Sequence, residues 1–135
     1  MTDCYCGSGQ NYNECCEPYH TASKMAQTAE ALMRSRYSAF VLGNESYLLA
    51  TWDEAKRPLS LGLSGDGIIW QRLNIIRCNK GREIHKQGTV EFKAYYQQDG
   101  HDFVLHEISR FKKNQVVWFY VDGAARIIPG LAAKK

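Results

Sequence analysis

The chain has 135 residues, of which 44% are hydrophobic and 12% aromatic. A chain of this length and composition can bury a hydrophobic core as one main domain, which excludes a globally disordered protein. Its 17 basic and 14 acidic residues give a net charge of +3, and the basic residues are scattered along the chain. Binding to nucleic acid or the ribosome is therefore allowed by the composition but not indicated by it.

The sequence indicates neither a signal peptide nor a membrane span. No charged segment followed by an apolar run opens the chain, and no apolar run approaches the roughly 18 residues that a membrane span needs. We therefore expect a cytoplasmic protein that does not associate with membranes.

Four of the five cysteines lie in the stretch CYCGSGQNYNECC, which covers residues 4–16. In a reducing compartment, thiols bind metals or act in catalysis instead of forming lasting disulfides. Two close pairs joined by a short loop can converge on one tetrahedral ion, and Zn²⁺ accepts four thiolates in closed structural sites. We expect one Zn²⁺, with iron as the alternative metal, bound by Cys4, Cys6, Cys15 and Cys16.

Two other interpretations of this cluster remain open from the residues alone. The cysteines could be unligated, or two of them could form a redox pair. The redox interpretation is disfavoured because the sequence has no C-x-x-C and a bridge between adjacent Cys15 and Cys16 would be strained. Gly7-Ser8-Gly9 favours metal binding, because flexible glycines can bring backbone N–H groups close to the thiolates.

The pattern C-x-C-x8-C-C, with Gly7-Ser8-Gly9 after the second cysteine and Tyr12 in the gap, resembles the SEC-C motif. This motif is a zinc-binding knuckle similar to the one at the C-terminus of the translocation motor SecA. The resemblance covers about the first sixteen residues. It implies that Cys4, Cys6, Cys15 and Cys16 are the ligands, the last at a position where some members have His.

Helical signals follow the cysteine cluster. Pro18 is expected to interrupt the chain, and Thr21 or Ser23 can cap a long helix that runs through KMAQTAEALMRSRYSAFVLG and ends at Gly43. Its apolar positions recur at helical spacing, and Arg36 falls on the same stripe. Asn44 can cap a second, shorter helix through ESYLLATW.

From about Gly67 onward, β-branched and aromatic residues dominate between turn signals. The pattern predicts four antiparallel strands near residues 68–78, 83–97, 102–112 and 116–121, with Gly88 as a bend or bulge. Helices followed by a strand meander indicate an α+β domain.

Two longer stretches, RSRYSAFVLGNESYLLATW and FKAYYQQDGHDFVLHEISRFKKNQVVWFYVDG, resemble the YchJ-like family of uncharacterised bacterial proteins. The resemblance implies a SEC-C zinc knuckle in residues 1–20 and a nuclear transport factor 2-like (NTF2-like) domain in residues 21–125. Residues 126–135 are then expected to be a C-terminal tail. The implied fold is a cone, in which helices pack on a curved four-stranded antiparallel sheet around a pocket.

The polar and aromatic residues of the expected pocket are Arg36, Tyr37, Trp52, Glu107 and Tyr120. Adjacent strand residues point to opposite faces, so His106 and Glu107 cannot both enter one pocket. A lone buried charge is costly, and we therefore expect Arg36 and Glu107 to form an ion pair inside the cone.

The remaining candidate residues give no catalytic arrangement. His20, His85 and His101 fall in loops or at strand ends without an evident partner, and Cys78 is expected to be buried or half-buried. No nucleophile and base are placed together by the sequence, so no catalytic residue is assigned.

Three functions follow as hypotheses. The first is a zinc-binding interaction or adaptor protein, with a protein partner on the knuckle and a scaffold or a small-molecule ligand in the cone. The second is a small-molecule enzyme, a hydrolase or isomerase, that uses the pocket. The third, weaker hypothesis is a surface for the ribosome or nucleic acid. An open pocket with polar groups favours the second over a scaffold, and a pocket filled by aromatic side chains favours the scaffold.

Overall fold

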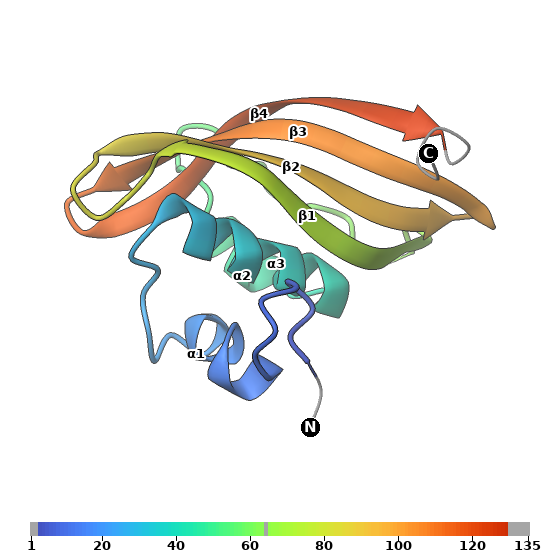
Figure 1. The fold of residues 1–135 in the computed structure, drawn as a ribbon, viewed down its shortest axis with the longest axis horizontal. Helices are drawn as coiled ribbons and strands as arrows, with labels where there is room; N and C mark the ends of the chain where they lie inside the picture. The colour runs from blue at the N-terminus through green and yellow to red at the C-terminus, as the bar shows by residue number, and fades with distance from the viewer. Residues whose placement is uncertain (1–2, 64, 130–135) are drawn as a thin grey trace.

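The computed structural model describes residues 3–63 and 65–129. One four-stranded antiparallel sheet dominates the fold, with the strand order β1-β2-β3-β4. Its strands are β1 (Ile68–Lys80), β2 (Gln87–Gln98), β3 (His101–Asn114) and β4 (Val117–Pro129). Figure 1 shows that the sheet is curved and that the helices lie on one side of it.

The helical part precedes the sheet in the chain. It consists of a 3₁₀ turn (Tyr12–Glu14), α1 (Glu17–His20), α2 (Ala29–Leu42) and α3 (Glu45–Ala50). In Figure 1, α2 runs directly beneath the sheet, while α1 and the N-terminal segment lie farther from it. None of the helices in the described residues is long and apolar enough to cross a membrane.

The predicted start of the long helix was wrong. Its N-cap is Thr28, whose hydroxyl accepts a hydrogen bond from the Ala31 amide at 3.0 Å. Thr21 and Ser23 instead donate to the carbonyl of Pro18, and Pro18 itself lies in the first turn of α1. The predicted end is confirmed, because Gly43 adopts a left-handed conformation with φ of 70°.

The second helix has the predicted cap, since the Asn44 side chain accepts from the Tyr47 amide. The four strands lie where the pattern predicts them, but some of them begin or end at other residues than predicted. β2 begins at Gln87, and β4 continues to Pro129, so residues 126–129 belong to the sheet and not to a tail. The rest of the expected tail lies outside the described residues.

Gly88 is neither a bend nor a bulge, because it keeps a regular register with Lys80 and Phe111. A Cβ atom at this position would lie 2.4 Å from the Cα of Gly81. Gly88 is therefore needed for a close backbone approach, while the register shifts occur in β1 and between β3 and β4.

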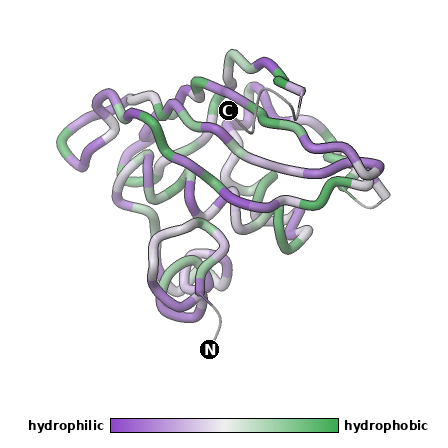
Figure 2. Tube along the Cα trace, turned by 45° about the vertical axis from the view of Figure 1, so that its right-hand side comes forward, coloured by the Kyte–Doolittle hydropathy of each residue, from purple (hydrophilic) through white to green (hydrophobic). Residues whose placement is uncertain are grey.

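The main core lies between α2 and the sheet. Its buried residues come from the segment leading into α2, from α2 itself and from β2, β3 and β4: Ala26, Ala29, Leu32, Met33, Tyr37, Val90, Phe92, Ala94, Phe111 and Trp118. Figure 2 shows hydrophobic and hydrophilic segments alternating along the strands, as expected for a sheet with one covered face. The N-terminal segment forms a separate small cluster in which cysteines are the buried residues.

Candidate functional site

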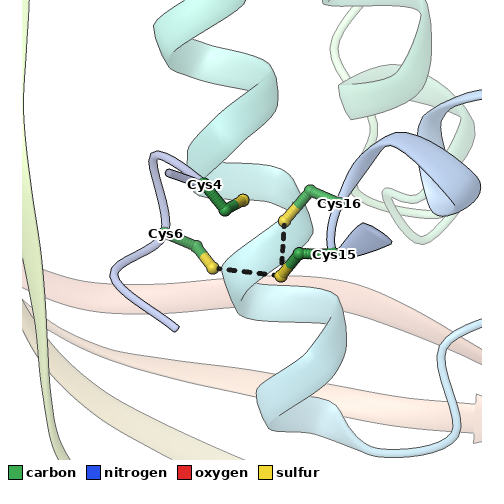
Figure 3. A group of neighbouring side chains, drawn as sticks. All are labelled: Cys4, Cys6, Cys15 and Cys16. Atoms are coloured by element: carbon green, nitrogen blue, oxygen red, sulfur yellow. Dashed lines mark hydrogen bonds between the residues drawn. The ribbon is translucent and has the colours of Figure 1, made fainter. Parts of the chain in front are cut away.

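The four N-terminal cysteines converge at one point beside α2 (Figure 3). All four sulfur atoms lie within 4.8 Å of one another. The Cys6 and Cys15 sulfurs are 3.6 Å apart, and those of Cys15 and Cys16 are 3.9 Å apart. These separations are too long for disulfides, and they match the edge of about 3.8 Å that a tetrahedron with 2.3 Å Zn–S bonds would have. The sequence prediction that these residues come together is confirmed.

Two serine hydroxyl groups lie beside the sulfurs. The Ser8 hydroxyl lies 3.1 Å from the Cys15 sulfur, and the Ser38 hydroxyl of α2 lies 3.5 Å from the Cys4 sulfur. Such contacts can orient thiolates and disperse their negative charge when a metal is bound. Cys4, Cys6 and Cys16 are buried and Cys15 is partly exposed, so the site is closed on most sides.

The knuckle, defined here as residues 3–20, is fastened to α2 by two further side chains. Arg34 donates from Nη1 to the Cys6 carbonyl at 2.7 Å and pairs with Glu30 on its own helix. His20 lies between the two parts, with Nδ1 2.7 Å from the Tyr12 hydroxyl and Nε2 2.8 Å from the Ser35 carbonyl. Sequence patterns could not indicate these partners of His20, because they lie on different elements.

The thiols of the metal-free cluster differ in acidity. Hydrogen bonding from Cys16 lowers the pKa of Cys6 to about 4. Burial raises the pKa of Cys15 to about 11, and hydrogen bonding to Cys6 together with burial raises the pKa of Cys16. Near neutral pH the metal-free cluster therefore keeps Cys6 as a thiolate and Cys15 and Cys16 as neutral thiols, and metal binding must displace the protons of these two thiols.

A cavity of about 180 Å³ lies between α2 and the sheet. All five predicted pocket residues line it, namely Arg36, Tyr37, Trp52, Glu107 and Tyr120. The rest of its wall is mainly apolar: Met33, Phe40, Trp70, Phe92, Ala94, Leu105 and Ser109. Aromatic side chains line this space without filling it.

Arg36 is a buried cation, only 3% exposed, at the wall of the cavity. Its Nη1 donates to the Leu48 carbonyl and to the Thr51 hydroxyl, each at 2.7 Å. Its guanidinium carbon lies 4.5 Å from the ring centre of Tyr120 and 5.2 Å from that of Trp52. Burial lowers the pKa of Arg36 to about 10, so the side chain still carries its charge at neutral pH.

The predicted ion pair between Arg36 and Glu107 was wrong. The ion pairs in the described part of the chain do not include one between these two residues. Tyr120 stands between them, with its ring against Arg36 and its hydroxyl donating to Glu107 Oε2 at 3.1 Å. The Ser109 hydroxyl donates to the same oxygen at 2.5 Å. Each charge is therefore solvated separately by protein groups.

His106, Cys78 and Trp118 lie away from the cavity. His106 points to the other face of the sheet, where it contacts Glu91 at 2.8 Å, as the strand alternation predicts. Cys78 is exposed, contrary to the sequence interpretation. Trp118 is buried in the core, and its indole N–H donates to the Gln27 carbonyl.

One feature of the cavity wall had no signal in the sequence. Trp52 Nε1 is a buried donor that has no hydrogen-bond acceptor among the described residues. A buried unpaired N–H is unfavourable, and groups of this kind often mark a position where another molecule supplies the partner.

Comparison with known proteins gives a consistent assignment. The family described as YchJ, middle NTF2-like domain, matches residues 28–123. The chain is 45% identical over 120 residues to UPF0225 protein SCO1677 of Streptomyces coelicolor, covering 89% of this chain and 93% of the relative. It is also 45% identical over 123 residues to a UPF0225 protein of Chromobacterium violaceum, covering 89% of this chain and 90% of the relative.

Two solved structures share the fold over most of their length. The solution structure of RPA3114, a SEC-C motif containing protein from Rhodopseudomonas palustris, has a TM-score of 0.82 at 31% identity. The match covers 93% of this chain and 99% of that protein. A crystal structure of a SEC-C motif containing protein from Psychrobacter arcticus has a TM-score of 0.73 at 30% identity, covering 88% and 80%. The expected α+β, NTF2-like fold with an N-terminal SEC-C segment is confirmed.

Proposed function

Because this chain belongs to the YchJ-like family, we propose that it is a zinc-stabilised binding protein whose cone takes up a small molecule. The observation that carries the proposal is that α2 contacts the knuckle on one side and lines the cavity on another. The knuckle contacts come from Arg34, Ser35 and Ser38, and the cavity lining comes from Met33, Arg36, Tyr37 and Phe40.

The ion would have a structural role. Four thiolates from Cys4, Cys6, Cys15 and Cys16 would complete a tetrahedral Zn²⁺, which leaves no open position for substrate or water. The sulfur separations support this set of ligands, and iron would fit the same set. Four thiolate ligands would suit a reducing compartment, and we propose a cytoplasmic location.

Metal analysis tests this part of the proposal. Protein purified without chelator is expected to contain about one zinc per chain, and Cys15→Ser should reduce the content well below that. Cys78→Ser is the matched control, because Cys78 is exposed and lies outside the cluster. Protein that lacks metal and does not take up added Zn²⁺ would contradict the proposal. Iron in place of zinc would support the site but show that the metal is iron.

The ligand-binding role of the cone is supported by the cavity. Its volume of about 180 Å³ exceeds the roughly 150 Å³ of an engineered cavity that accommodates benzene. The mixture of an apolar wall with a few polar groups is typical of small-molecule sites. A hydrolase or isomerase that used this wall could draw on Glu107, whose carboxylate accepts hydrogen bonds from the hydroxyls of Ser109 and Tyr120.

An adaptor role for the knuckle is a second candidate function. It is supported by Tyr5, an aromatic side chain that is 37% exposed on the knuckle. Exposed tyrosines are enriched where proteins contact each other. Tyr5→Ser should then abolish the capture of a specific cytoplasmic protein without changing the metal content, and the same capture by both forms would contradict this role.

A further inference from the structure

The charges in the cavity wall are opposite in sign and do not neutralise each other by contact. Arg36 is held by two oxygen acceptors and two aromatic rings, and Glu107 by two hydroxyl donors. Arg36 is buried and Glu107 is half-buried. A charge that is withdrawn from water without a counter-charge is costly, so charged groups inside proteins are normally paired. A ligand with one group for each charge would supply both missing partners.

Both charged side chains retain unused hydrogen-bonding capacity. The described hydrogen bonds of Arg36 all start from Nη1, which leaves Nε and Nη2 without an acceptor among the described residues. The hydrogen bonds that Glu107 accepts both end on Oε2, so Oε1 has no donor among the described residues. Trp52 Nε1 adds an unpaired donor on the Arg36 side, where its ring packs on the guanidinium. The available donors thus lie near Arg36, and the available acceptor lies on Glu107.

The remaining wall sets the shape and polarity of the ligand. Phe40, Trp70, Phe92 and Leu105 provide an apolar surface, and the volume of about 180 Å³ limits the ligand to about a dozen non-hydrogen atoms or fewer. A simple hydrocarbon would leave both charges unpaired. An apolar monocarboxylate would satisfy Arg36 but would bring a second negative charge near Glu107.

We propose that the cavity binds a small zwitterion with an apolar body, of the class of an aliphatic α-amino acid. The ligand carboxylate would accept hydrogen bonds from Arg36 and Trp52, and its ammonium group would donate to Glu107. The apolar side chain would pack against the aromatic wall. This inference rests on the proposed binding function of the cone and adds the chemical class of the ligand.

Four probes with related bodies test the inference by calorimetric titration: L-leucine, 4-methylpentanoate, 3-methylbutylamine and 4-methylpentan-1-ol. L-leucine carries both charges, each of the next two carries one, and the alcohol carries none. We expect L-leucine to bind at least tenfold more tightly than each of the others, because a hydrogen bond between charged groups contributes roughly that much or more.

A variant makes the test specific to Glu107. Glu107→Gln should weaken L-leucine binding at least tenfold and should not weaken the binding of 4-methylpentanoate, which has no ammonium group. Glu91→Gln is the matched control, because Glu91 pairs with His106 on the opposite face of the sheet. Circular dichroism of both variants verifies the fold.

The outcomes distinguish the inference from the function on which it rests. If the alcohol or a singly charged probe binds as tightly as L-leucine, the cone binds small molecules but the zwitterion class is wrong. If Glu107→Gln weakens L-leucine and 4-methylpentanoate equally, the ammonium contact to Glu107 is wrong. If none of the four probes binds, both the inference and the proposed binding function of the cone are contradicted.

Discussion

Arg36 shows how a single charge is accommodated in an apolar interior. Its guanidinium has two short hydrogen bonds and stacks on two rings, a combination that depends on its planar shape. We expect Arg36→Lys to lower the free energy of unfolding by about 2 kcal/mol, because a desolvated cation–π contact contributes about that much. Urea denaturation measures the change.

The control for this substitution is Arg72→Lys. Arg72 stacks on Tyr95 at 3.7 Å but is exposed to solvent. The same change there should lower the free energy of unfolding by less than about 1 kcal/mol. If Arg36→Lys and Arg72→Lys lowered the free energy of unfolding equally, the claim that burial strengthens the contacts of Arg36 would be contradicted.

Gly123 leaves room for the Glu107 carboxylate. A Cβ atom at this position would lie 2.2 Å from Glu107 Oε2, the atom that accepts from both Tyr120 and Ser109. Gly123→Ala should therefore displace the carboxylate and lower the free energy of unfolding by about 1–3 kcal/mol. Ala124→Ser, at the neighbouring exposed position, should change it by less than about 0.5 kcal/mol. A melting temperature of Gly123→Ala equal to that of the parent protein would contradict this packing.

At the residue scale, the sequence could place Arg36 and Glu107 on facing surfaces because helix and strand periodicity assign residues to faces. It could not show whether the two side chains touch, since that depends on the distance between the helix and the sheet. In the structure, Tyr120 lies between Arg36 and Glu107, so each charged side chain has a different set of partners.

His20 connects three elements by its two ring nitrogens, and its ring also packs on Tyr47 of α3. His20→Phe keeps a ring but removes both hydrogen bonds. We expect a loss of about 1–3 kcal/mol in the free energy of unfolding, because the half-buried Tyr12 hydroxyl and the buried Ser35 carbonyl each lose a hydrogen bond. His101→Phe is the matched control, since His101 is exposed at the start of β3, directly after the turn that follows β2. A loss no greater than that of the control would contradict the connecting role of His20.

At the element scale, the sequence predicted which elements form better than where they begin. Thr21, Ser23 and Thr28 are all suitable N-caps, so local chemistry could not choose among them. Contacts from distant residues decide the choice: the Ala29 amide donates to the Gly81 carbonyl, and Trp118 donates to the Gln27 carbonyl. Distant contacts also explain why β4 is longer than predicted. Gly123, Ala124 and Ala125 are weak strand formers by themselves, but they pair with residues of the long strand β3.

The knuckle has few apolar residues of its own, as its pale and purple colours in Figure 2 indicate. Its stability should therefore depend on the metal. We expect chelation to expose the amides of residues 3–20 to hydrogen exchange, while those of β2 and β3 remain protected. Loss of protection in all segments in one transition would show that knuckle and sheet form a single cooperative unit.

Metal binding should also depend on pH across the whole neutral range. Near pH 7 the metal-free cluster retains protons on Cys15 and Cys16, whose pKa values are raised, and Zn²⁺ requires both as thiolates. The two protons released from Cys15 and Cys16 predict that the apparent affinity for Zn²⁺ weakens at least about 100-fold for each unit by which the pH falls. Competition with a chromophoric chelator at pH 6, 7 and 8 measures this slope. An affinity independent of pH would contradict it.

The order of the elements along the chain has a consequence for synthesis on the ribosome. The knuckle is complete once its first 20 residues have emerged, and each sheet strand pairs with its neighbour in sequence. α2 instead needs partners from far downstream: the Gln27 carbonyl accepts from Trp118, 91 residues later. The apolar side of α2 is therefore fully covered only once the last hairpin is made, and until then the nascent chain exposes part of its core to aggregation and to chaperones.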